Sequence, residues 1–90
     1  MREDIVKRLH EALDTMGLPP LSSMRDLKRR YRTLARRYHP DGGGDEEEME
    51  RINRAYELLK EYMENYRFSF TEDEILKQFP WENHTKRFRF

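Results

Sequence analysis

The residues most able to do chemistry stand together in the short stretch RRYHPDGGGDEEE, residues 36–48. A histidine, a proline and an aspartate follow one another there as His39, Pro40 and Asp41. Proline fixes its own backbone torsion and disfavours helical geometry at the residue before it, so a preceding helix ends at the tripeptide. Asp41, held on such a turn, can accept a charge-assisted hydrogen bond from an arginine of another protein. The tripeptide is therefore a candidate recognition element.

The sequence has no pattern that is typical of a catalytic or metal centre. No nucleophile, base and orienting group stand in a recognisable order. The chain contains no cysteine, and His10 and His84 have no metal-ligand residues as company. We therefore expect that the protein is not an enzyme and that it needs no cofactor and no metal.

The composition is that of one small, highly charged domain. The chain has 90 residues, of which 40% are charged and 36% hydrophobic, and its formal net charge is zero. Aromatic residues, at 12%, argue against a disordered chain. The absence of cysteine suits a reducing compartment, and the first residues form neither a secretory signal nor a membrane span. The expected protein is a cytoplasmic monomer with no membrane partner.

Apolar residues recur at helical spacing in three stretches, which predicts three helices. Gly17 is a usual C-terminal cap, and Ser23 and Asp26 have the spacing of a capping box. Four acids at residues 45–48 favour the positive end of a helix dipole. The glycines at 42–44 are expected to form a flexible hinge. The predicted helices span residues 2–16, about 23–39 and about 45–65.

One face of the second predicted helix is strongly basic. Residues 25–38 hold seven bases and one acid. Four arginines lie in one narrow arc opposite the apolar stripe, where they could steer an acidic surface toward the helix. The alternative is a solvated face paired with acids of the third helix, at about 0–1 kcal/mol a pair, which suits the flanking Arg30 and Arg37 better. The arc consists of Arg25, Arg29, Arg32 and Arg36.

These elements predict an all-α fold. The helices at about 23–39 and 45–65 are joined by a short glycine-rich loop, so they should form an antiparallel hairpin. The N-terminal helix is expected to pack on this hairpin and complete its core. The His-Pro-Asp tripeptide then lies at the exposed tip of the hairpin.

The phrase DLKRRYRTLARRYHPDGGGDEEEMERINRAYELL resembles the J-domain of the DnaJ co-chaperones, over roughly residues 10–62. This resemblance implies a domain that docks on an ATP-bound DnaK-type chaperone, of the seventy-kilodalton heat-shock class, and stimulates its ATP hydrolysis to aid protein folding. It implies that His39, Pro40 and Asp41 are functional. Further partner-facing residues follow from the resemblance and from the basic arc. These are Lys28, Arg29, Tyr31 and Arg32, joined by Arg25 and Arg36.

The resemblance also sets the expected domain organisation. The J-domain is placed at residues 1–65 and an aromatic-rich extension at residues 66–90. No glycine-phenylalanine-rich linker, zinc module or client-binding domain follows, so a J-domain-only protein is expected.

The extension is too rich in aromatic residues for a free, soluble segment. Thr71 and Glu74 have capping-box spacing, which predicts a short helix to about Phe79. We expect this helix to fold back, with Trp81 largely buried. The alternating segments YRFSF and KRFRF pair as a ribbon or lie extended across the helices; the alternative is a recognition segment for a client or adaptor. Ile75, Leu76 and Phe79 are expected to cover Ala55, Leu58 and Tyr62.

Two other functions remain as alternatives. The first is nucleic-acid binding through the basic helix and the KRFRF tail. Zero net charge and the eight acids in residues 45–64 count against it, because a polyanion would be repelled. The second is an inactive J-like scaffold, whose tail alone makes the biologically relevant contact. The intact tripeptide in its surrounding phrase argues against this scaffold.

Overall fold

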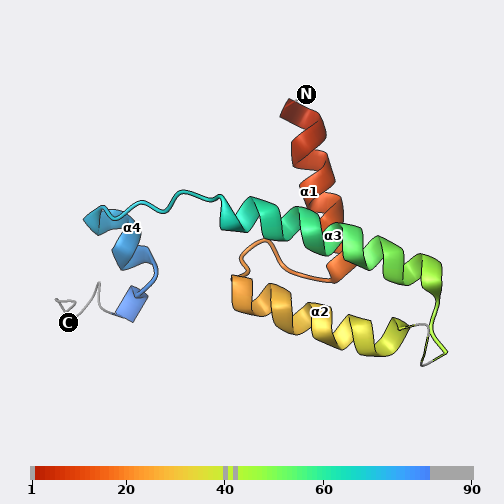
Figure 1. Ribbon diagram of the computed structural model, residues 1–90. Helices are drawn as coiled ribbons and strands as arrows, with labels where there is room; N and C mark the ends of the chain where they lie inside the picture. Colours follow the sequence, from red (N-terminus) through yellow and green to blue (C-terminus); the bar gives the residue numbers. More distant parts are fainter. Residues whose placement is uncertain (1, 40, 42, 82–90) are drawn as a thin grey trace.

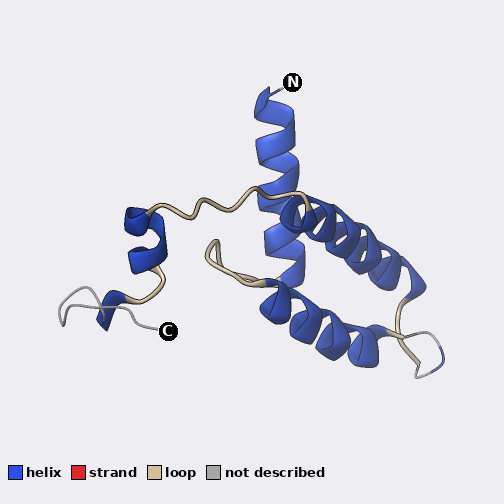
Figure 2. Cartoon of the chain, turned by 60° about the vertical axis from the view of Figure 1, so that its left-hand side comes forward, coloured by secondary structure: helices blue, strands red, loops and turns tan. Residues whose placement is uncertain are grey.

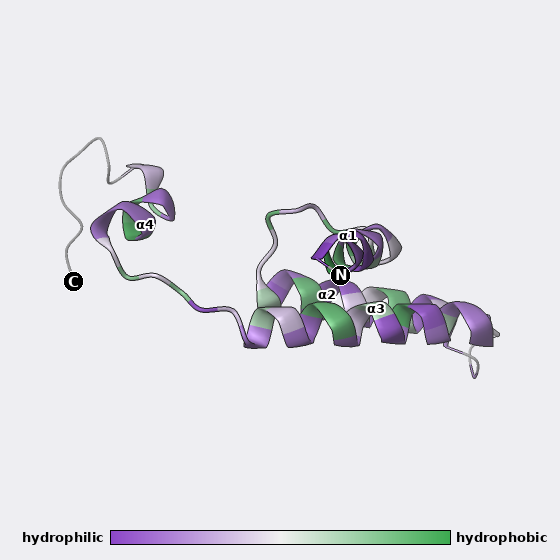
Figure 3. Cartoon of the chain, turned by 90° about the horizontal axis from the view of Figure 1, so that it is seen from above, coloured by the Kyte–Doolittle hydropathy of each residue, from purple (hydrophilic) through white to green (hydrophobic). Residues whose placement is uncertain are grey.

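The computed structural model describes residues 2–39, 41 and 43–81, and within them the fold is all-α, as predicted. α2 and α3 lie side by side as an antiparallel hairpin, and α1 crosses one face of the pair (Figures 1 and 3). α4 lies apart from the three other helices, at the end of an irregular segment (Figure 2). The helices are α1 (Arg2–Met16), α2 (Met24–Tyr38), α3 (Glu46–Glu64) and α4 (Glu72–Lys77).

The predicted helix ends are confirmed by their caps. Gly17 follows α1 with a φ of +71°, and the Leu18 amide donates to the Leu13 carbonyl at 2.9 Å. This pairing is the Schellman arrangement, in which a glycine in the left-handed region ends a helix. α2 begins with a full capping box between Ser23 and Asp26. The chain between Gly17 and Ser23 can therefore turn sharply from α1 into α2.

α3 begins and ends at polar caps. The Asp45 side chain accepts hydrogen bonds from the amides of Glu47 and Glu48, at 2.9 and 3.3 Å. At the other end, the Asn65 amide donates to the Glu61 carbonyl. Because α3 is the longest helix, it can contact both of its neighbours.

The core lies where α3 meets α1 and α2, which both pack against it. Met16, Leu27 and Ile52 are fully buried there, one from each helix. Burial of each large apolar side chain stabilises the fold by about 1.5–3 kcal/mol. The buried residues are Ala12, Met16, Leu27, Leu34, Met49, Ile52, Ala55 and Leu59.

The N-terminal half of α1 takes less part in the core than its apolar stripe suggests. Ile5 and Val6 share a helix face with Met16, yet 41% and 50% of their surface is exposed. α1 crosses the hairpin at a steep angle, so its first turns project beyond α3 (Figure 1). Only its C-terminal half can bury apolar side chains against the hairpin.

The predicted burial of Trp81 is wrong, because 62% of its surface is exposed. The predicted cover of Tyr62 by the short helix is also absent, because Tyr62 is 50% exposed and contacts Tyr66 edge-on at 5.8 Å. Ala55 is buried in the hydrophobic core all the same, and Leu58 packs against that core partly buried. The buried core residues all come from α1, α2 and α3, so α4 is not required for the burial of Ala55.

The C-terminal extension differs from its prediction in two further ways. α4 is capped by Thr71 as expected, but it ends at Lys77. Residues 66–70 are irregular, so the first half of the predicted ribbon is not a strand. Its second half, residues 86–90, lies outside the described residues. Within the described part of the chain, no helix is long and apolar enough to cross a membrane.

Candidate partner-binding site at the hairpin tip

α2 ends where the candidate site begins. The amide of His39 donates to the Ala35 carbonyl at 2.9 Å, which closes the last turn. His39 itself has a φ of −63° and a ψ of 133°, so the chain leaves the helix at this residue. Such an extended conformation is the one that a following proline imposes. Pro40, the middle residue of the predicted site, lies outside the described residues.

His39 and Asp41 are brought together by the turn. The Asp41 amide donates a hydrogen bond to Nδ1 of His39 at 3.2 Å, and the nearer carboxylate oxygen lies 3.8 Å from the same nitrogen. The Asp41 side chain is 94% exposed and that of His39 is 56% exposed. The Asp41 carboxylate is therefore open to a partner, while the His39 ring is partly occupied by its own loop.

Gly44, the last residue of the predicted flexible hinge at residues 42–44, makes a hydrogen bond within the loop. The Gly44 amide donates to the His39 carbonyl at 3.0 Å and closes the loop. A Cβ atom on Gly44 would overlap the carbonyl group of Tyr38, so no other residue fits there without a backbone shift. Gly43 has a φ of +83°, which glycine adopts most easily, and has open space around its Cα. The tip is thus a closed loop built on one tightly packed glycine.

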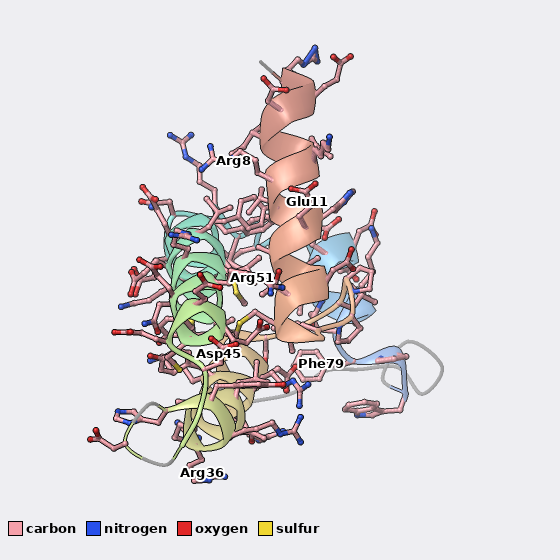
Figure 4. All side chains as sticks on the ribbon, turned by 90° about the vertical axis from the view of Figure 1, so that its right-hand side faces the viewer. Arg8, Glu11, Arg36, Asp45, Arg51 and Phe79 are labelled. Atoms are coloured by element: carbon pink, nitrogen blue, oxygen red, sulfur yellow. The ribbon has the colours of Figure 1, made fainter. Side chains whose placement is uncertain are left out.

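The basic arc lies on the exposed side of α2. All four arginines of the arc and Lys28 are exposed, and Arg36 projects outward at the hairpin end (Figure 4). From Arg25 to Arg36 the arc runs about 16 Å along the helix, at 1.5 Å per residue. It therefore reaches to within one helical turn of His39.

The acids of α3 do not neutralise this arc. Among the described residues, no ion pair joins α2 to α3; the pairs of α3 lie within the helix, from Glu48 to Arg51 and from Glu50 to Arg54. On α2 itself, Arg29 lies 3.7 Å from Asp26 in an exposed pair. In the described part of the chain, the basic face is therefore not paired with the third helix, contrary to the predicted alternative.

Tyr31 is only half available to a partner. Its hydroxyl donates to Oδ1 of Asn53 at 2.7 Å, and its ring stacks on Tyr56 with centroids 4.2 Å apart. Both partners belong to α3, so Tyr31 ties the hairpin together on one side. The rest of the Tyr31 side chain stays partly exposed.

Arg30 has a structural role that sequence reasoning missed. Its Nε donates to the Met16 carbonyl at 2.7 Å, in a half-buried position. The carbonyls at a helix C-terminus lack partners and carry partial negative charge, so a guanidinium suits this place. Arg30 thus ties α2 to the end of α1. The Gly17 cap marks where such carbonyls stand, but the crossing of α1 and α2 decides which arginine reaches them.

One acidic residue, Asp26, interrupts the basic charge of α2. At its start, the Ser23 amide and then its hydroxyl hydrogen-bond the Asp26 carboxylate and lower the pKa of this group. Asp26 therefore stays charged and marks the one acidic position on an otherwise basic helix.

Within the described residues, no cluster of histidine, aspartate or glutamate side chains could hold a metal ion. The arrangement suits recognition of a charged protein surface.

Comparison with known proteins matches residues 11–67 to the DnaJ domain family. The chaperone protein DnaJ of Crocosphaera subtropica is 53% identical over 51 residues, which make up 53% of this chain and 14% of that protein. DnaJ of Rippkaea orientalis is 49% identical over 51 residues, with the same coverage. The small t antigen of budgerigar fledgling disease virus is 40% identical over 53 residues, 59% of this chain and 37% of that protein. No solved structure matches.

Proposed function

The chain belongs to the DnaJ domain family, and we propose that it docks on the ATP-bound form of a DnaK-type chaperone and stimulates its ATP hydrolysis. In this role the protein catalyses no reaction of its own. It acts on the ATPase of its partner and so aids protein folding. The matched proteins are much longer than the matched segment, so their full activities are not transferred to this chain.

One observation carries the proposal: the exposed Asp41 carboxylate stands at the end of a basic helical face that has no ion pair with α3 in the described residues. A basic face attracts an acidic protein surface and raises the rate of encounter. Asp41 can then accept a charge-assisted hydrogen bond from an arginine of the chaperone. The arc brings the partner to the tip, and the tip makes the specific contact.

The residues of the site divide between these two tasks. Asp41 makes the specific contact, within the tripeptide that it forms with His39 and Pro40. The exposed bases Arg25, Lys28, Arg29, Arg32 and Arg36 attract the partner, and Tyr31 adds an aromatic edge. Tyr31 is held by Asn53 and Tyr56, so it can offer a contact without losing side-chain entropy on binding.

The exposed aromatic residues after α3 support a second contact. Phe68, Phe70 and Trp81 are 71%, 81% and 62% exposed, and exposed apolar patches mark interaction sites. We propose that residues 66–90 recruit a client or an adaptor, while residues 1–65 act on the chaperone. We also propose that the protein acts as a monomer in the cytoplasm.

Single-turnover ATP hydrolysis by a DnaK-type chaperone, with and without this protein, tests the proposed function. Stimulation in proportion to added protein is expected. Binding to labelled single-stranded and double-stranded nucleic acid is measured in parallel. No stimulation together with tight, salt-sensitive nucleic-acid binding would favour the alternative reading of the basic helix. Absence of both activities would favour the inactive scaffold.

A further inference from the structure

The His39 ring is engaged inside the loop rather than directed wholly toward a partner. Nδ1 accepts the hydrogen bond of the Asp41 amide at 3.2 Å. A ring nitrogen that accepts a hydrogen bond carries no proton, so a neutral His39 bears its proton on Nε2. The side chain thus acts on the backbone two residues ahead, as aspartate and asparagine side chains do in Asx turns.

The backbone of His39 is held at the same time from outside the tripeptide. Its amide donates to the Ala35 carbonyl of α2, and its carbonyl accepts from the Gly44 amide at 3.0 Å. A side chain at Gly44 would overlap the backbone of Tyr38, directly before His39. Three hydrogen bonds therefore converge on His39, from α2, from Gly44 and from Asp41.

We infer that His39 is a positioning residue, which fixes the direction of Asp41 through Nδ1 and need not touch the chaperone. Gly44 supports the same geometry from the other side of the loop. This inference rests on the proposed function, because it assigns the parts that His39 and Asp41 play in one site. A nearly fully exposed aspartate would otherwise sample many directions, and only the docked molecules in which it faces the arginine of the chaperone would stimulate hydrolysis.

Two substitutions separate a positioning role from direct contact. In asparagine Oδ1 is attached to Cγ, as Nδ1 is in histidine, so His39→Asn keeps an acceptor for the Asp41 amide. In His39→Gln the amide reaches the position of Nε2 and leaves Asp41 without its acceptor. We expect His39→Asn to retain most of the stimulation. His39→Gln and His39→Ala should lower maximal stimulation about two- to tenfold, as loss of one net hydrogen bond predicts.

The concentration that gives half-maximal stimulation is a second readout. The basic arc is expected to determine how often the two proteins meet, so this concentration should change little in all three His39 variants. The maximal rate should fall in His39→Gln and His39→Ala. Gly44→Ala should lower the maximal rate as His39→Gln does. Gly43→Asn is the matched control, because Gly43 has open space and asparagine tolerates a positive φ.

A measurement without the chaperone tests the hydrogen bond itself. In isotope-labelled protein, NMR should detect a scalar coupling across the hydrogen bond between the Asp41 amide nitrogen and Nδ1 of His39. Absence of this coupling in the wild type would overturn the inference. Full stimulation by His39→Gln would overturn it as well. So would a His39→Asn variant that loses as much stimulation as His39→Ala. If the wild type shows the coupling but stimulates no DnaK-type chaperone, the proposed function fails and the positioning of Asp41 stands.

Discussion

Replacement of Arg30 by alanine should destabilise the fold. Replacement of the exposed arginines around it on α2 should change the stability little. Its Nε donates to the Met16 carbonyl at 2.7 Å in a half-buried position. A hydrogen bond to a charged donor contributes about 1.5–3 kcal/mol, and a cation at a helix C-terminus a further 0.3–1 kcal/mol or so. Because Arg30 is only half-buried, we expect Arg30→Ala to lower the free energy of unfolding by about 2 kcal/mol.

Arg32 provides the matched control on the same helix. It is exposed and has no ion pair in the described residues, so Arg32→Ala should change stability by at most about 0.5 kcal/mol. In a domain of this size about 1 kcal/mol shifts the midpoint of thermal unfolding by roughly 4–8 °C. Arg30→Ala should therefore lower the midpoint by about 8–16 °C, and Arg32→Ala by less than about 4 °C.

Urea and thermal unfolding, followed by circular dichroism, measure both variants. Arg30→Lys keeps the charge but loses the guanidinium, and should fall between Arg30→Ala and the wild type. Equal stability of Arg30→Ala and Arg32→Ala would refute the assignment of Arg30 to the end of α1. It would return Arg30 to the solvated face that the sequence favoured.

Arg32→Glu should slow association with the chaperone at low salt, and its difference from the wild type should fade as the screening length falls from about 10 Å at 0.1 M salt to about 3 Å at 1 M. Stopped-flow association across a salt series measures this, with Lys7→Glu on α1 as the control. Equal association rates of the wild type and Arg32→Glu at low salt would contradict the prediction. The lowered pKa of Asp26 adds stability that is complete above the unfolded value of 3.8 and is lost as the pH falls through the folded pKa. Unfolding at a series of acid pH values should show this slope in the wild type, reduced in Asp26→Asn, and an unchanged slope would refute it. Truncation after residue 65 should leave the unfolding midpoint unchanged. In the intact chain, the fluorescence of Trp81 should be that of an exposed indole. A blue-shifted Trp81 emission, together with a lower unfolding midpoint after truncation, would contradict the exposed extension.

The helices and their caps could be predicted because they depend on nearby residues. Gly17, the Ser23–Asp26 pair and Thr71 act over a few positions, and each cap is confirmed. The hairpin followed from two apolar stripes and the short loop between them. The position of the candidate site at the tip is a consequence of the same pattern.

The features that the sequence did not disclose depend on how distant segments meet. Arg30 reaches the Met16 carbonyl only because α1 and α2 cross at that point, and Gly44 is restricted only by the backbone of Tyr38. The error at Trp81 had another origin. Its aromatic character indicated burial, but the core formed by α1, α2 and α3 buries Ala55 without the extension, while Tyr62 stays 50% exposed.

The central claim is that Asp41, presented at the hairpin tip, stimulates the ATPase of a DnaK-type chaperone, and single-turnover ATP hydrolysis tests it most directly. The wild type, Asp41→Asn and Glu47→Gln are compared at equal concentration, beside their thermal unfolding. Glu47 is an exposed acid near the tip, so its variant loses the same charge outside the tripeptide. We predict full stimulation by the wild type and Glu47→Gln, and none by a folded Asp41→Asn. Full stimulation by Asp41→Asn would contradict the account.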